Sequence, residues 1–392
     1  MPIAKLLTAM LGALAFTLPA AARSVSTIAC PLRDQPYSSR SPLIDLLLKP
    51  EATAVIERDA PGMIARFWAG EKSVTAPSFG SIVTLRSAAG TNGLPDDVWA
   101  TIDRDLERLT ITPGDKQARC ARYDEDATPL ALPARHPAIL VFEKMTGFLD
   151  ESSVAAAHAA LFAIAPRKGW GIVATDRGGA ITVANLRHFD AVIWNNVSGD
   201  ALTVAQRRAF RSYIEHGGGF VAVHGAGGDP AYFWDWYIDA LIGARFIGHP
   251  MAPQFQEAHV IVTDPASPIV RAVAPGWRMT DEWYSFRPNP RANGAHVLLA
   301  LDETTYSPRS GEKDLRMGDD HPIAWTRCVG DGRSFFSAIG HRPEGYSEPH
   351  YVQVLEAGIT WAAGDGASRC KQGREVARSR INPPERSARA DR

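Results

Sequence analysis

The strongest constraint on the fold is a regular alternation of short apolar segments with helix-like segments after residue 137. The apolar segments are residues 138–142, 170–174, 191–194 and 217–225, with helix-like sequences at 153–165 and 203–216. Runs that are apolar along their whole length are typical of strands buried on both faces. A spacing of about 20–35 residues between them suits βαβ units, so the sequence predicts a parallel sheet with flanking helices.

The rest of this region is richer in strands. Further strands are predicted at residues 258–262, 296–301, 322–327 and 333–338, with a closing helix at 351–363. We therefore predict one α/β domain that covers residues 137–364.

The N-terminus has the features of a secretory signal peptide. In residues 1–22, Lys5 precedes an apolar run, and the segment ends in three alanines. A membrane anchor is the alternative, but the run is short for a bilayer span, and no later segment is apolar enough to cross one. We expect a mature protein in the periplasm or outside the cell, without a stable membrane anchor.

Three further segments complete the predicted organisation. Residues 23–112 should form a small helical module, because Val98, Trp99, Ile102 and Leu106 share one helix face. Residues 113–136 are polar and contain prolines, as a linker would, and residues 365–392 form a basic tail that we expect to be disordered.

Four cysteines remain in the mature chain, an even number that is typical of disulfide-bonded exported proteins. Three pairings are possible. Cys30 and Cys120 bracket the N-terminal region, and Cys328 and Cys370 lie near the C-terminus, so we favour Cys30–Cys120 and Cys328–Cys370. The cysteines have no C-x-x-C spacing, which makes a metal site on them unexpected. The chain has 42 basic and 43 acidic residues, and this balance argues against nucleic acid as a partner.

His224 is the first candidate functional residue. It ends the apolar segment of GGGFVAVHGAGG, residues 217–228. Ligands of open α/β sheets bind at the carboxyl ends of the strands, and the surrounding glycines allow a sharp turn and a close approach. A buried histidine with a purely structural hydrogen bond is the alternative.

Other histidines and an acidic pair also stand at the ends of predicted strands. Asp281 and Glu282 lie among tryptophans, where a carboxyl pKa rises, while His321 and His341 each flank a strand. We consider Asp281, Glu282, His224 and His341 as catalytic candidates. Imidazoles and carboxylates bind Zn, Mn or Fe, so His224, Glu282, His321 and His341 are candidate metal ligands.

An aromatic segment, YFWDWY at residues 232–237, closely follows the His224 turn. Aromatic rings stack on sugars, so Trp234 and Trp236, together with Tyr284, are candidate substrate-binding residues. A buried aromatic cluster would have the same sequence.

Several motifs in one order resemble the ThuA-like (trehalose-utilisation) family. They are FEKMTGF at 142–148, GGGFVAVHGA at 217–226, FIGHP at 246–250, DEWYSF at 281–286, DETTY at 302–306, DHPIAW at 320–325 and GRSFFSAIGH at 332–341. The resemblance implies a flavodoxin-like sheet of the class I glutamine amidotransferase-like type. It also implies a role in the catabolism of trehalose-like sugars and their 3-keto derivatives.

At two positions this chain has a different residue from the one expected by comparison. His224 stands where true amidotransferases have a cysteine nucleophile, so thioester chemistry is excluded here. Asp150 stands where the family usually has a histidine, and it is a candidate for substrate binding or for carboxylate ligation of a metal.

We therefore expect a secreted enzyme, a lyase or hydrolase that acts on a 3-keto-glycoside or a related saccharide with histidine or metal assistance. The alternative is a non-catalytic protein that binds carbohydrate or takes part in an assembly, since a fold does not determine a function. A third possibility, a cysteine-independent hydrolase, lacks an evident Ser-His-Asp arrangement.

Overall fold

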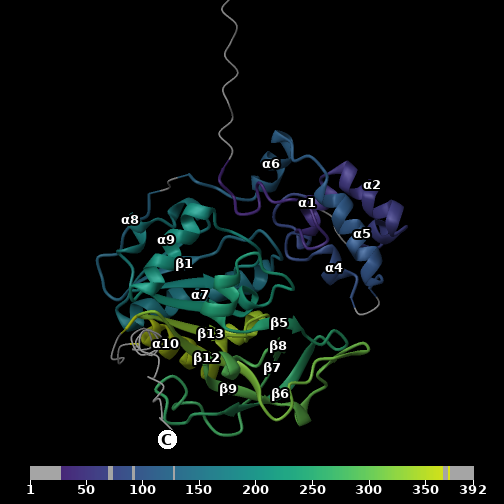
Figure 1. The fold of residues 1–392 in the computed structure, drawn as a ribbon. Coiled ribbons are helices and arrows are strands. Elements are labelled where there is room, and N and C mark those ends of the chain that lie inside the picture. Colours follow the sequence, from purple (N-terminus) through teal and green to yellow (C-terminus); the bar gives the residue numbers. More distant parts are fainter. Residues whose placement is uncertain (1–27, 69–73, 91–92, 127–128, 365–369, 371–392) are drawn as a thin grey trace, which may run out of the picture.

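The structure is a computed structural model that describes residues 28–68, 74–90, 93–126, 129–364 and 370. Figure 1 shows two parts, a cluster of helices near the N-terminus and an α/β unit built around one large sheet. The predicted signal peptide and all of the predicted tail except Cys370 lie outside the described residues.

The central sheet has nine strands. In spatial order they are β2 (Gly171–Thr175), β1 (Ala138–Phe142), β3 (Ala191–Asn195), β4 (Gly219–Val223), β13 (Gly332–Ser337), β12 (His321–Val329), β9 (His296–Asp302), β6 (Phe255–Val262) and β7 (Arg278–Glu282). The first five strands are parallel, as predicted, and the pairs from β13 to β7 are antiparallel. The sheet is therefore mixed, with the predicted parallel strands in one half and antiparallel strands in the other.

Four helices of the α/β unit pack against this sheet: α7 (Glu151–Lys168), α8 (Val183–Leu186), α9 (Val204–Glu215) and α10 (Pro349–Ala362). Local sequence explains their ends. The Asp150 carboxylate accepts the first free N–H groups of α7, and Gly169 ends that helix with a positive φ of 73°. Thr203 and Gln206 form a capping box at the start of α9.

Two small sheets lie beside the large one. They pair β5 (Arg245–Gly248) with β8 (Ser285–Arg287), and β10 (Arg309–Ser310) with β11 (Lys313–Asp314). Neither sheet was predicted from the sequence. The β5–β8 sheet matters for function because it fixes two segments, the one that directly follows β5 and the one that directly precedes β8.

The N-terminal cluster contains α1 (Leu43–Leu47), α2 (Pro50–Asp59), α3 (Met63–Trp68), α4 (Leu85–Ala88) and α5 (Asp96–Glu107). As predicted, it is helical, and it has a core of its own that includes Leu46, Ile56, Trp99 and Ile102. The predicted linker differs from expectation, because it begins with a helix, α6 (Pro113–Cys120), which a capping box of Thr112 and Asp115 starts.

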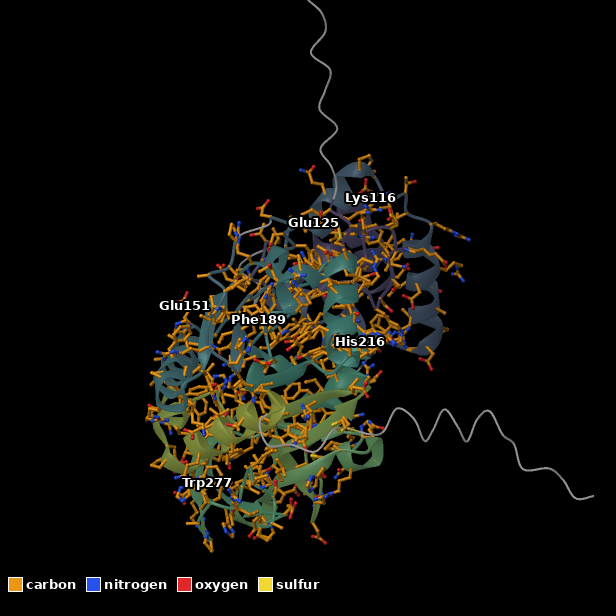
Figure 2. All side chains as sticks on the ribbon, turned by 90° about the vertical axis from the view of Figure 1, so that its left-hand side faces the viewer. Lys116, Glu125, Glu151, Phe189, His216 and Trp277 are labelled. Carbon is orange, nitrogen blue, oxygen red and sulfur yellow. A yellow bond between two sulfur atoms is a disulfide. The ribbon has the colours of Figure 1, made fainter. Side chains whose placement is uncertain are left out.

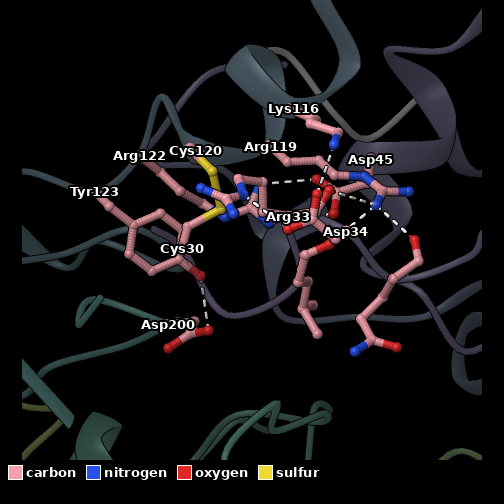
Figure 3. Close-up of a disulfide and its surroundings, with 12 residues drawn as sticks. Cys30, Arg33, Asp34, Asp45, Lys116, Arg119, Cys120, Arg122, Tyr123 and Asp200 are labelled. Carbon is pink, nitrogen blue, oxygen red and sulfur yellow. Dashed lines mark hydrogen bonds and ion pairs between the residues drawn. A yellow bond between two sulfur atoms is a disulfide. The ribbon is translucent and has the colours of Figure 1, made fainter. Parts of the chain in front are cut away.

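The Cys30–Cys120 disulfide joins the first described residues to the end of α6 (Figure 3). Arg119 donates hydrogen bonds to three backbone carbonyls in the segment that follows Cys30, and these bonds hold that segment in place. Tyr123 donates a hydrogen bond of 2.7 Å to Asp200, which belongs to the α/β unit. The disulfide region therefore lies at the junction between the two parts.

The second disulfide joins Cys328 of β12 to Cys370, so both favoured pairings are present in the structure. Two disulfides are typical of proteins outside the cytoplasm. Across the described ranges, the helices are too short or too polar to span a membrane.

Side chains fill the interior along the whole molecule, from Lys116 on α6 at one end to Trp277 at the other (Figure 2).

Candidate active site

His224 occupies a strained position at the carboxyl end of β4. Its φ is +40°, a left-handed conformation that is uncommon for residues other than glycine and that often marks functional sites. The side chain is buried, and its Nδ1 lies 2.7 Å from the carbonyl oxygen of Ala338. Nδ1 must therefore carry the proton, which leaves the lone pair of Nε2 free to accept a hydrogen bond or bind a metal.

Among the glycines near His224, Gly228 has a clear steric role. A Cβ added to Gly228 would lie 2.5 Å from the ring and hydroxyl of Tyr284. Only glycine permits this approach, which places the Tyr284 hydroxyl 2.8 Å from Nε2 of His224.

Three potential ligand atoms meet beside this histidine: Nε2 of His224, Nδ1 of His341 and Oε2 of Glu282. The two imidazole nitrogens are 3.2 Å apart, and the carboxylate oxygen lies 3.5 Å from His224 and 3.1 Å from His341. Ligands bound tetrahedrally at ~2.0 Å from a zinc ion are separated by about 3.3 Å. The three residues thus match one face of a tetrahedral site, and this group could hold a divalent metal ion.

Glu282, the last residue of β7, is the centre of this group. Its Oε1 accepts a hydrogen bond of 2.5 Å from Gln254 and lies 3.1 Å from Nδ1 of His249, while Oε2 faces His224 and His341. Burial alone would raise the pKa of Glu282. The hydrogen bonds and charges of the surrounding histidines outweigh this and lower the pKa well below its usual range, so the carboxylate is ionised.

His341 follows β13 and is oriented by a second carboxylate. Its Nε2 lies 3.4 Å from Oδ2 of Asp150, which directs Nδ1 toward Glu282. Burial lowers the pKa of His341, but the hydrogen bond and charge of Glu282 outweigh burial and raise it above its ordinary value. Asp150, at the start of α7, thus holds His341 in position through the ring nitrogen that does not face Glu282.

Asp281 lies next to Glu282 but serves a different purpose. It is fully buried, and its carboxylate accepts hydrogen bonds from the backbone N–H groups of Gly340, His341 and Arg342. Burial raises the pKa of Asp281, as expected for at least one acid of the pair. The structure therefore places Asp281 as a support for the His341 segment, outside the cavity.

The group of His224, Glu282 and His341 forms the floor of a cavity of about 300 Å³. This volume is at the lower end of the range for small-molecule sites. Besides the three metal-binding candidates, Asp150 and Tyr284 also line it. Of the sequence candidates, the structure thus brings together His224, Glu282, His341, Asp150 and Tyr284.

His321 is not part of this group, although the sequence placed it among the metal ligands. Both ring nitrogens have other partners: Nδ1 lies 2.6 Å from Oε1 of Glu303, and Nε2 lies 2.8 Å from the carbonyl oxygen of Tyr284. A fully buried imidazole with both nitrogens engaged has a structural role, so we remove His321 from the candidate ligands.

Trp234 and Trp236 also lie elsewhere, away from the lining of this cavity. The guanidinium of Arg207 lies 5.1 Å from the Trp234 ring, and that of Arg211 lies 5.5 Å from the Trp236 ring. Both arginines belong to α9. The structure therefore favours the alternative of a packed aromatic cluster for this segment.

Three features of the cavity were not predicted from the sequence. His249 belongs to the FIGHP motif, which could have marked it, and it lines the cavity beside Glu282. Phe79 and Ile82 reach the cavity from the N-terminal region, and no sequence signal predicts that contact. Asp229 also lines it, buried behind the glycine-rich turn.

Asp229 holds the loop after β3. Its carboxylate accepts hydrogen bonds of 2.5 Å from the Ser198 hydroxyl and 2.7 Å from the Gly199 N–H group. Ser198 in turn accepts the N–H of Phe148, another residue of the cavity lining. Burial outweighs these hydrogen bonds and raises the pKa of Asp229 to about 7.

We expect Asp229 to make stability depend on pH. Because its pKa is higher in the folded state than in the unfolded chain, its contribution is complete below pH ~4 and is lost as the pH rises toward about 7. An Asp229→Asn variant, which can still bond to Ser198 and Gly199, should lack this loss. Thermal unfolding of both proteins between pH 4 and 8 should therefore show the wild type losing stability relative to the variant. A constant difference would contradict this prediction.

Comparison with solved structures gives matches of low identity. A protein described as ThuA-like from Bacteroides uniformis is 24% identical, and the match covers 57% of this chain and 90% of that chain with a TM-score of 0.49. One from Parabacteroides merdae, also described as ThuA-like, is 17% identical over 58% of this chain and 90% of that chain, with a TM-score of 0.42. A β-galactosidase from Rahnella sp. R3 is 14% identical over 67% of this chain and 34% of that chain, with a TM-score of 0.35.

No curated protein sequence matches the chain. A family model described as trehalose utilisation (ThuA) matches residues 138–362, which include every strand of the central sheet and the residues His224, Glu282 and His341. This match spans more than half of the chain. The protein therefore belongs to the trehalose-utilisation (ThuA) family.

Proposed function

We propose that this protein is an exported enzyme of carbohydrate catabolism that cleaves a 3-keto-glycoside by elimination or hydrolysis. The observation that carries the proposal is the meeting of His224, Glu282 and His341, at distances suited to a metal ion, on the floor of a cavity of small-molecule size. The two disulfides support a location in the periplasm or outside the cell.

The chemistry follows from the ketone. A carbonyl at C3 acidifies the C2–H bond, so a base can remove that proton. The electron pair then forms a C1–C2 double bond while the C1–O bond breaks, and the glycosidic oxygen takes up a proton and leaves as an alcohol. Addition of water to the double bond would give the products of hydrolysis.

His249 is the proposed base. Its Nδ1 lies 2.9 Å from the carbonyl oxygen of Pro250 and 3.1 Å from Glu282, so Nδ1 carries the proton and Nε2 has the lone pair. Burial lowers the pKa of His249, which keeps the ring neutral and able to accept the C2 proton.

The single O–H group of Tyr284 faces Nε2 of His224, and with that nitrogen bound to a metal ion it would be free to donate a hydrogen bond to a substrate oxygen. Burial raises the pKa of the Tyr284 hydroxyl, which therefore stays protonated. A Zn, Mn or Fe ion held by His224, Glu282 and His341 would polarise the C3 carbonyl and stabilise the enolate. Asp150 and Asp281 would keep His341 in place for that purpose.

The proposal is tested with the mature protein, residues 23–392, and 3-keto-trehalose. We expect release of the leaving sugar from the 3-keto compound, loss of activity after chelation, and recovery with one equivalent of a divalent transition metal. Unoxidised trehalose is the matched control and should not react, because its C2–H bond is not acidic. Equal cleavage of trehalose, or full activity of the chelated protein, would contradict the proposal.

A further inference from the structure

The cavity has two chemically different ends. All the polar side chains that line it are buried or half-buried, among them His224, Glu282 and His341, which form its floor. Among the described residues that line it, the exposed ones are all apolar: Phe79, Phe148, Pro230 and Met251. The mouth is therefore an apolar rim above a polar floor.

This rim is part of a concentration of exposed apolar side chains. Within the described ranges, eight large hydrophobic side chains are exposed, and five of them line this cavity or the hollow next to it. They are Phe79, Phe148, Leu149, Met251 and Phe255. Single exposed apolar residues need no explanation, but a cluster at the mouth of a polar cavity indicates a binding surface.

The N-terminal region supplies one side of the rim. Phe79, in the short helix η1 (Phe79–Ser81), is 51% exposed, whereas Ile82 beside it is buried. Backbone hydrogen bonds fix this segment on the α/β unit: the Ser78 N–H donates to Thr146 at 3.1 Å, and the Ala231 N–H donates to Ile82 at 2.9 Å. Phe79 is therefore held in position at the mouth by a docked backbone.

We propose that the rim is a leaving-group subsite that selects glycosides with an apolar, aryl-bearing leaving group. The inference rests on the proposed function, in which the oxidised sugar ring occupies the polar floor beside His224 and Tyr284. The group on its glycosidic oxygen then extends toward the mouth. There it meets the rings of Phe79 and Phe148 and the thioether of Met251.

A second sugar would gain less from contact with this rim than an apolar group of similar size. Its hydroxyls lose hydrogen bonds to water when they are buried, and the exposed rim residues offer no polar side chain in return. An aryl group gains free energy from the same contact, because its apolar surface is removed from water. The helical region would thus have a role in substrate selection.

The experiment compares 3-keto glucosides that carry an ethyl or a 3-phenylpropyl leaving group. Both leave as primary alcohols, so their intrinsic reactivity is matched and only their apolar bulk differs. We expect a KM about tenfold lower for the phenylpropyl compound, with little change in kcat. Phe79→Ser and Met251→Ser should bring the ratio of the two KM values close to one.

A control variant separates this effect from a general loss of surface hydrophobicity. Val183 is 66% exposed on α8 and is not part of the cavity lining, so Val183→Ser should keep the tenfold ratio. Calorimetric titration with the unoxidised ethyl and phenylpropyl glucosides gives the same comparison without turnover.

The binding measurement also separates the two proposals. Tighter phenylpropyl binding that Phe79→Ser abolishes would support the subsite even if no 3-keto-glycoside were cleaved. Equal binding of both glucosides would overturn the subsite even if the enzyme were active. A dimer in sedimentation experiments that Phe79→Ser dissociates would also overturn it, since the rim would then be an interface between copies.

Discussion

Replacing His224 with alanine should lower the turnover of a 3-keto-glycoside by about 10²–10⁴-fold, the usual cost of removing one group from a catalytic site. His224 supplies the Nε2 atom that faces both Glu282 and His341. The bound metal, measured by elemental analysis, should fall with activity.

Two further variants separate chemistry from folding. His224→Gly removes the same imidazole but also relieves the positive φ of 40°, so it should be at least as stable as His224→Ala and equally inactive. His296, with 57% of its side chain exposed, provides a control, and His296→Ala should retain both metal and activity. An active His224→Ala protein would remove this residue from the mechanism.

The parallel half of the fold was predictable because its signal is local. Each of the segments that became β1, β2, β3 and β4 is a short apolar run bounded by turn residues or by a helical pattern. In contrast, β7 reads RMTDE, and it ends in two acidic residues of types that are depleted in strands. It forms because β6 pairs with it along its length, a contact between distant segments that overrides local preference.

The candidate site was predictable only in part, from the local signal of its strand ends. His224 and His341 follow parallel neighbours, β4 and β13, so their strand-end positions place them together. His321 starts β12, which is antiparallel to β13, and it therefore lies at the same edge of the sheet. Its nitrogens nevertheless face Glu303 and a backbone carbonyl, a choice of partner that strand-end position alone does not determine.

The apolar rim shows what a single sequence does not reveal. Phe79 and Met251 are far apart in the chain, and neither stands in a pattern that marks it as functional. Their proximity depends on how the helical region docks beside the glycine-rich turn. Such docking is a property of two folded surfaces, so it emerges only when both are in place.

The last prediction concerns how metal affinity depends on pH. In the metal-free protein, Glu282 is ionised and raises the pKa of His341 above the ordinary value of ~6.5, so His341 is protonated in mildly acidic solution. A metal ion can bind Nδ1 only after that proton leaves. Affinity should therefore rise by about tenfold per pH unit for each proton displaced, and this rise should continue above pH ~6.5 until the raised pKa of His341 is passed.

Competition with a chromophoric chelator at a series of pH values measures this dependence, and two carboxylate–histidine pairs, Glu282 with His341 and Glu303 with His321, provide a matched test. Glu282→Gln removes the charge that raises the pKa of His341, so the affinity should level off at lower pH and be weaker throughout, by at least about tenfold. Glu303→Gln alters the equivalent contact with His321, 2.6 Å long and away from the cavity, and should leave the curve unchanged. Because only the first pair faces the site, a pH-independent affinity, or an equal effect of both variants, would show that His341 is not a ligand.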